Sequence, residues 1–162
     1  MSSVSFSNLT TSPLFKGMNN DELSCLEGIF TARRIKEGKT IFIENMPGES
    51  LYLIKQGTVK ISRMLAEGDE QILIVLGPED VFGEMAVLDG GKRSATARIA
   101  EDVILYGLTR EDFEMLATQN PSLGLKFTLN IVRIFSSRVR SSQKDYRAML
   151  LASLNRPAQK GG

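Results

Sequence analysis

Apolar and polar residues alternate in short runs through the middle of the chain, and this pattern predicts β-strands. Within residues 51–54 and 59–61 the apolar positions partly alternate, as in strands with one face in a core and one in water. Turn residues separate the runs, for example Gly57 between the second and third strands. The predicted strands are 40–43, 50–55, 58–65, 71–76, 95–100 and 103–108. Their spacing indicates a sandwich or roll over about 34–108.

Helical spacing on both sides of the strands predicts flanking helices. Residues 13–30 are expected to hold N-terminal helices, in which Asn19 caps the first turn and Glu22 follows three positions later. A second helical region opens at Thr109, where Asp112 can complete a cap, and it ends before Pro121. The strand region is therefore bracketed by helices at both ends.

A longer helix is predicted from Pro121 to about Leu151. Its apolar residues recur at steps of three and four, which predicts a stripe that packs against the roll or against a second copy of the chain. The stripe contains Leu125, Leu129, Val132, Phe135 and Val139. The predicted domain spans 13–151, with N-terminal helices at about 13–30, the roll at about 34–108 and C-terminal helices at about 110–151. The ends, 1–12 and 152–162, are expected to be flexible.

Composition narrows the function. A chain of 162 residues with 42% hydrophobic residues can bury one core, so a single domain is expected. A net charge of +1 does not indicate direct binding to nucleic acid or to an acidic membrane. The chain has no histidine and a single cysteine, which argues against metal centres and triad chemistry. The absence of a signal sequence or a long apolar run favours the cytoplasm.

Residues 81–96 carry the most specific chemistry in the chain. Gly83 permits close approach of the backbone to a ligand, and Glu84, Met85 and Ala86 can form a helical turn with free amides that suit a phosphate. The planar guanidinium of Arg93 matches two phosphate oxygens. Beside it, Ser94 offers a hydroxyl and Ala95 an amide. A carboxylate such as Glu84 accepts a hydrogen bond from a sugar hydroxyl, so the pattern predicts a sugar-phosphate ligand. Residues 83–86 and 93–95 are the candidate cassette.

This cassette resembles the phosphate-binding cassette of the cyclic-nucleotide-binding domain family, which includes catabolite activator proteins and the regulatory domains of cyclic-nucleotide-dependent kinases. The resemblance extends over about 13–150 and implies an antiparallel β jelly roll with N-terminal helices and a long C-terminal helix. Further matching segments are Leu14-Phe15, 38–42, 51–54, 57–59 and 76–78. Asn45 and Glu79 stand where the family often has glycine, and Lys92 replaces a frequent proline.

The resemblance also implies a role for each cassette position. Gly83 and Glu84 contact the ribose 2′-hydroxyl, Arg93 pairs with the cyclic phosphate, and Ser94 and Ala95 add phosphate hydrogen bonds. The implied ligand is cAMP or cGMP, with no further cofactor. Ser141 and Ser142 lie roughly where bacterial relatives place polar groups against the base. Arg138 and Arg140 are expected to face water.

The favoured function is a regulatory module, not an enzyme. Ligand binding is expected to shift the C-terminal helix and to signal through a homodimer or a protein partner that contacts this helix, without direct contact to nucleic acid or membrane. The alternative is a truncated or fragmentary Crp/Fnr-type transcriptional regulator, because only 12 residues follow Leu150 and no DNA-binding domain is evident in them. A metal-binding cupin-type enzyme is disfavoured by the missing histidines.

Overall fold

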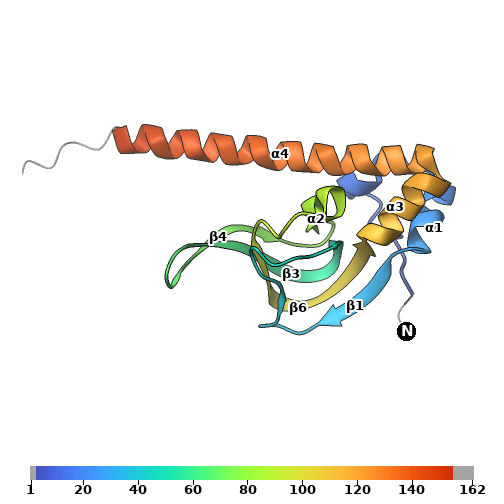
Figure 1. Ribbon diagram of the computed structural model, residues 1–162, viewed down its shortest axis with the longest axis horizontal. Helices are drawn as coiled ribbons and strands as arrows, with labels where there is room; N and C mark the ends of the chain where they lie inside the picture. Colours follow the sequence, from blue (N-terminus) through green and yellow to red (C-terminus); the bar gives the residue numbers. More distant parts are fainter. Residues whose placement is uncertain (1–2, 155–162) are drawn as a thin grey trace, which may run out of the picture.

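One antiparallel sheet of six strands curls into a roll, and helices cover one end of it (Figure 1). The computed structural model describes residues 3–154. The strands are β1 Thr31–Ile35, β2 Thr40–Phe42, β3 Ser50–Ala66, β4 Asp69–Leu76, β5 Val81–Phe82 and β6 Thr96–Thr109. The helices are η1 Pro13–Phe15, α1 Asn20–Glu27, α2 Glu84–Asp89, α3 Arg110–Gln119 and α4 Pro121–Leu154. The main path of the sheet is β1-β6-β3-β4, with β2 paired to β6 and β5 paired to β3.

The two long strands β3 and β6 form the centre of the roll. The breaks predicted within them, at residues 56–57 and 101–102, are wrong. Each strand continues through its expected turn because the pair keeps its antiparallel register, which shifts at bulges between Ile54 and Val59. Gly57 absorbs this distortion with φ +90°, and an added Cβ would lie 2.2 Å from the carbonyl oxygen of Asp102. The sequence pattern does not reveal β1, which has a largely polar sequence and side chains that are exposed or only partly buried.

The helix caps read from the sequence are confirmed. The Asn19 side chain accepts a hydrogen bond from the Glu22 amide at 2.9 Å, and the Thr109 hydroxyl accepts one from the Asp112 amide at 3.1 Å. These bonds satisfy amides that have no partner within the helix. The helical regions on both sides of the roll therefore begin where the local signals predict.

Two residues in glycine-like positions have left-handed backbones. Asn45 has φ 67° and Glu79 has φ 77°, in agreement with their places in the family pattern. Glu79 tolerates this conformation poorly, and its surroundings compensate. Its carbonyl oxygen accepts a hydrogen bond from the Ser12 hydroxyl at 2.8 Å, and its carboxylate accepts one from Thr11 at 2.5 Å. The N-terminal segment thus braces this turn.

The core has two parts, one inside the roll and one between the roll and the helices. The second part includes Phe6 and Leu9, which are 1% and 2% exposed, so the prediction that 1–12 form a flexible end is wrong for these residues. Phe6 packs against the rings of Phe15, Phe30 and Tyr106. The folded unit therefore begins before Pro13. At the other end α4 continues to Leu154, so residues 152–154 of the predicted flexible end 152–162 are helical, and 155–162 lie outside the described residues.

Helix α4 has two apolar faces, only one of which packs against the rest of the domain. The packed face consists of Leu123, Phe127, Ile131 and Ile134. Asn130 adds two hydrogen bonds from its side-chain amide to the carbonyl oxygens of Leu14 and Lys16. The stripe predicted from the sequence is exposed by 38–60% and does not form this contact. The second half of α4 runs above the β3–β4 hairpin, and its last turns extend past the tip of this hairpin (Figure 1).

Candidate functional site

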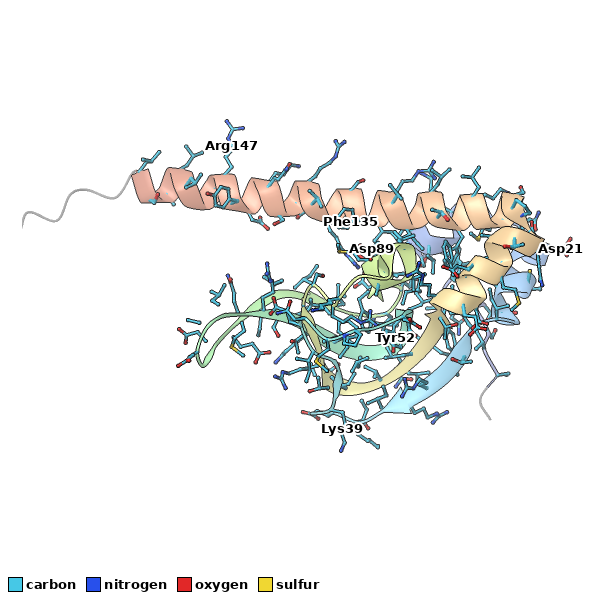
Figure 2. The ribbon with its side chains drawn as sticks, in the orientation of Figure 1. Asp21, Lys39, Tyr52, Asp89, Phe135 and Arg147 are labelled. Atoms are coloured by element: carbon cyan, nitrogen blue, oxygen red, sulfur yellow. The ribbon has the colours of Figure 1, made fainter. Side chains whose placement is uncertain are left out.

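A cavity of about 420 Å³ lies where α2, the β3–β4 hairpin and α4 meet. All seven cassette residues line it: Gly83, Glu84, Met85, Ala86, Arg93, Ser94 and Ala95. The size falls within the range of small-molecule binding sites. Figure 2 shows Phe135 on the side of α4 that faces the roll, where it adds to the cavity wall, whereas Arg147 points away from the roll.

The turn before α2 brings backbone close to the cavity. Gly83 precedes the helix with φ 77°, and a Cβ there would lie 2.8 Å from Arg93 Nη1 and 2.9 Å from the Ser50 carbonyl oxygen. Only glycine fits these two constraints without displacing its neighbours. The first amides of α2, from Glu84 onward, have no acceptor within the helix. Glu84, Met85 and Ala86, which carry these amides, line the cavity together with Arg93.

Arg93 is buried, with 5% of its surface exposed, yet it forms no ion pair within residues 3–154. Its Nη1 donates a hydrogen bond to the Gly83 carbonyl oxygen at 3.2 Å, and its Nε has no partner in the described chain. Burial lowers the pKa of Arg93, while Tyr52 and Glu84 act in the opposite direction. The guanidinium still remains charged at neutral pH. The cavity thus contains a buried cation that forms an ion pair with no carboxylate of the described residues.

Glu84 is also buried, at 7% exposure, and it faces α4. Its Oε1 accepts a hydrogen bond from Arg138 Nη1 at 3.3 Å. Arg138 also donates to the Val81 carbonyl oxygen. The prediction that Arg138 faces water is therefore wrong, because a buried carboxylate attracts the nearest cation that the helix can supply. Arg140 is exposed, as predicted.

The cavity lining carries an excess of positive charge. It includes the side chains of Arg63, Lys92, Arg93 and Arg138, whereas Glu84 is its only carboxylate among the described residues. Arg63 is paired with Glu44 at 3.0 Å, which leaves Lys92 and Arg93 as the cations without a carboxylate partner in the described chain. An anion that enters this cavity therefore meets uncompensated charge.

The rest of the lining is apolar and comes from both sides of the cavity. The roll supplies Phe42, Ile61, Leu73, Ile74 and Phe82, and α4 supplies Phe135 and Val139. Such surfaces suit the faces of a planar aromatic group. On α4, Ser142 and Gln143 add polar groups near these walls. Ser141 instead lines a neighbouring cavity of about 710 Å³, to which Ser142 also contributes.

Sequence analysis missed Phe135, Arg138 and Gln143 as site residues. Their signal is helical spacing, because side chains three, four or seven positions apart share a face. Phe135, Val139 and Ser142 follow this spacing. The register of α4 relative to the cassette could not be read from one sequence.

Two further findings concern residues 3–154. No group of three histidine, cysteine, aspartate or glutamate side chains is placed to hold a metal ion there. None of the helices in this part combines the length and apolar character required to cross a membrane.

Fold and cavity define a jelly-roll domain built around an electropositive ligand site. Residues 32–120, more than half of the chain, match the family model of the cyclic nucleotide-binding domain. The chain belongs to this family.

Three comparisons illustrate the relationship. The chain is 37% identical over 131 residues to the cyclic AMP receptor protein of Thermus thermophilus, covering 81% of this chain and 59% of that protein. It thus spans less than two thirds of this relative. The crystal structure of the Thermus thermophilus catabolite activator protein superposes with a TM-score of 0.75 at 36% identity, covering 87% of this chain and 63% of that one. The regulatory domain of Toxoplasma gondii PKA, crystallised with cAMP, gives 0.60 at 30% identity, covering 66% and 41%.

Proposed function

We propose that this chain binds a cyclic purine mononucleotide, cAMP or cGMP, in the cavity beneath α4 and acts as a regulatory module rather than as an enzyme. The observation that carries the proposal is the buried guanidinium of Arg93, which lacks an ion-pair partner in the described chain. A buried charge of this kind is costly unless an opposite charge joins it. A cyclic phosphate supplies one negative charge shared by its two exocyclic oxygens, which the planar guanidinium can engage.

The cassette binds the phosphate of the ligand at one end and the ribose at the other. The phosphate lies against Arg93, the free amides of α2 and the hydroxyl of Ser94, and the ribose hydroxyl donates to Glu84. The purine lies between the apolar walls, where Ser142 and Gln143 are within reach of its edge. Both cAMP and cGMP fit this scheme, because the polar groups on α4 can donate as well as accept. Titration calorimetry of the full chain with each nucleotide tests the proposal. We expect micromolar or tighter binding of at least one, and no binding of either would contradict it.

Ligand binding is proposed to act on α4 through Arg138. This residue joins Glu84, which the ribose must reach, to the middle of α4. A ligand that engages Glu84 therefore changes the contacts that hold α4. The helix moves between two positions if the ligand binds the protein more tightly when α4 is in one of them than in the other. We expect saturating nucleotide to slow hydrogen exchange of the amides in 135–143 relative to the packed segment 123–131. Unchanged exchange rates in 135–143 would argue against the movement.

A homodimer is proposed to form along the exposed face of α4. Steps of four and three residues define a heptad seam: Leu125, Leu129, Val132, Ser136, Val139, Gln143, Tyr146 and Leu150. Its six apolar members are 38–61% exposed. Apolar residues at this spacing drive two helices to pack in a coiled coil. Val139 and Gln143 also line the cavity, so the proposed seam and the ligand site adjoin each other along α4.

Sedimentation equilibrium measures the dimer directly. We expect the full chain to be dimeric at tens of micromolar and the Leu129→Glu variant to be monomeric, because the new charge would be buried in the seam. Lys144→Glu is the matched control, since Lys144 is exposed on the same helix at a position that does not flank the seam. A monomeric wild-type chain at this concentration would refute the dimer.

A Crp/Fnr-type transcriptional regulator is the second candidate function. The similarity to the cyclic AMP receptor protein of Thermus thermophilus favours it, because this chain spans only 59% of that protein. In such a protein the domain described above would be the sensor. The reading frame that encodes the chain decides between the two functions, since a helix-turn-helix encoded after α4 would support the regulator.

A further inference from the structure

We propose that Phe42 and Gly48 are positioning residues that form a slot for the Arg93 guanidinium and hold it in the orientation that the ligand requires. This inference rests on the proposed function, because the slot has a purpose only if Arg93 binds an anion. It concerns residues outside the cassette. Phe42 ends β2, and Gly48 lies in the loop 43–49 between β2 and β3.

An arginine side chain that nothing restrains is expected to turn outward into water. Burial removes its hydration, and the one carboxylate among the described lining residues, Glu84, is engaged by Arg138. Arg93 donates one hydrogen bond, to the Gly83 carbonyl oxygen, and its buried Nε has no partner within residues 3–154. Other contacts must therefore keep the guanidinium inside.

The ring of Phe42 provides the first of these contacts. The guanidinium carbon Cζ of Arg93 lies 4.0 Å from the centroid of this ring, which is cation–π distance. The negative face of the ring partly replaces the missing anion. Phe42 in turn packs against the rings of Tyr52 and Phe82, with centroids 6.4 Å and 5.9 Å away. These neighbours fix the direction of its face.

Gly48 provides the second contact. A Cβ on this residue would lie 2.1 Å from Arg93 Nε and 2.6 Å from Cζ, so the guanidinium occupies the space that a side chain would need. The same loop also clamps the Arg93 backbone. The Arg93 amide donates to the Met46 carbonyl oxygen at 2.9 Å, and the Asn45 amide donates to the Arg93 carbonyl oxygen at 2.8 Å. Backbone and side chain of Arg93 are thus held by one loop.

The substitution Gly48→Ala tests the slot. The atoms in its way belong to the flexible end of Arg93, so the fold is expected to survive while the guanidinium is displaced. We expect nucleotide affinity to fall about tenfold, with the melting temperature unchanged. Gly77→Ala is the matched control, because a Cβ at Gly77 meets nothing within 4 Å and its φ is not positive. Unchanged affinity in Gly48→Ala would overturn the role of Gly48.

A double-mutant cycle separates positioning from general packing. Phe42→Leu is expected to weaken binding roughly tenfold to thirtyfold in the wild-type background and to have no further effect in the Arg93→Ala background. Phe42→Tyr, which keeps the ring face, should rescue most of the affinity. If Phe42→Leu weakens binding by the same factor in both backgrounds, Phe42 only packs the cavity floor and the inference fails, while the proposed function stands.

The resonance of the Arg93 Nε–H group gives a measurement that needs no ligand. We expect the ring current of Phe42 to shift this proton to low frequency in the nucleotide-free protein, and the shift to vanish in Phe42→Leu. A resonance at the ordinary position of a solvent-exposed arginine would overturn the slot itself. Failure of the wild-type chain to bind either nucleotide would instead overturn the proposed function, so the two failures are distinguishable.

Discussion

Replacing Arg93 by alanine is expected to weaken cyclic-nucleotide binding by roughly 10- to 150-fold. This range corresponds to the ~1.5–3 kcal/mol that hydrogen bonds to charged groups contribute. The loss should be largest for this residue because its guanidinium is already desolvated and has no ion-pair partner in the described chain. Calorimetric titration of the wild type and the variant measures the effect.

The stability of the Arg93→Ala variant shows whether a loss of binding comes from the missing guanidinium or from unfolding. A buried charge without an ion pair stabilises the fold little, so the melting temperature should stay the same or rise. Arg98→Ala is the matched control for charge, because Arg98 pairs with Glu70 at 3.1 Å on the exposed surface and does not line the cavity. Equal affinity in Arg93→Ala and the wild type would refute the phosphate site.

Replacing Glu84 by alanine is expected to remove discrimination at the ribose. The wild type should bind a cyclic nucleotide at least about tenfold more tightly than its 2′-deoxy analogue, because the 2′-hydroxyl donates to a buried carboxylate. In Glu84→Ala the two ligands should bind with equal affinity. Competition titrations with cAMP and 2′-deoxy-cAMP measure the ratio.

The ratio isolates the ribose contact from indirect effects. Loss of Glu84 also releases Arg138, which could alter α4 and change the affinity for both ligands together. Only a direct contact between Glu84 and the ribose makes the affinity depend on the 2′-hydroxyl. Glu70→Ala is the matched control, since Glu70 binds Ser62 and Arg98 away from the cavity. A variant that retains the wild-type preference for the ribose form would exclude the assigned role of Glu84.

That residues 83–86 and 93–95 meet at one cavity was predictable, because these residues are close in sequence. Gly83 and Arg93 are ten positions apart, and a short helix and a turn between two strands suffice to bring them to one cavity. The residue types also carry their chemistry with them, since an arginine fork suits a phosphate wherever a fold places it. The same reasoning cannot locate Phe42 and Gly48, which reach Arg93 from a loop more than forty positions earlier.

Helix α4 shows where local patterns stop being sufficient. Spacing alone predicted a long helix with an apolar stripe, and that helix exists. It could not show that a second face, centred on Phe127, packs against the roll, because both faces are apolar. It also could not show that Arg138 points to Glu84, since the choice between water and a buried carboxylate depends on how the helix is rotated.

Short-range physics was enough to define strands with turns between them, capped helices, and an acid and an arginine spaced for a sugar phosphate. Propensity, alternation and capping act over a few residues, so one sequence contains them in full. Packing decided the rest: the continuity of β3 and β6, the burial of Phe6, the face of α4 that covers the roll, and the surroundings of Arg93. These features depend on contacts between segments that are far apart in the sequence. The free energies of such contacts cannot be read from a short stretch of residues.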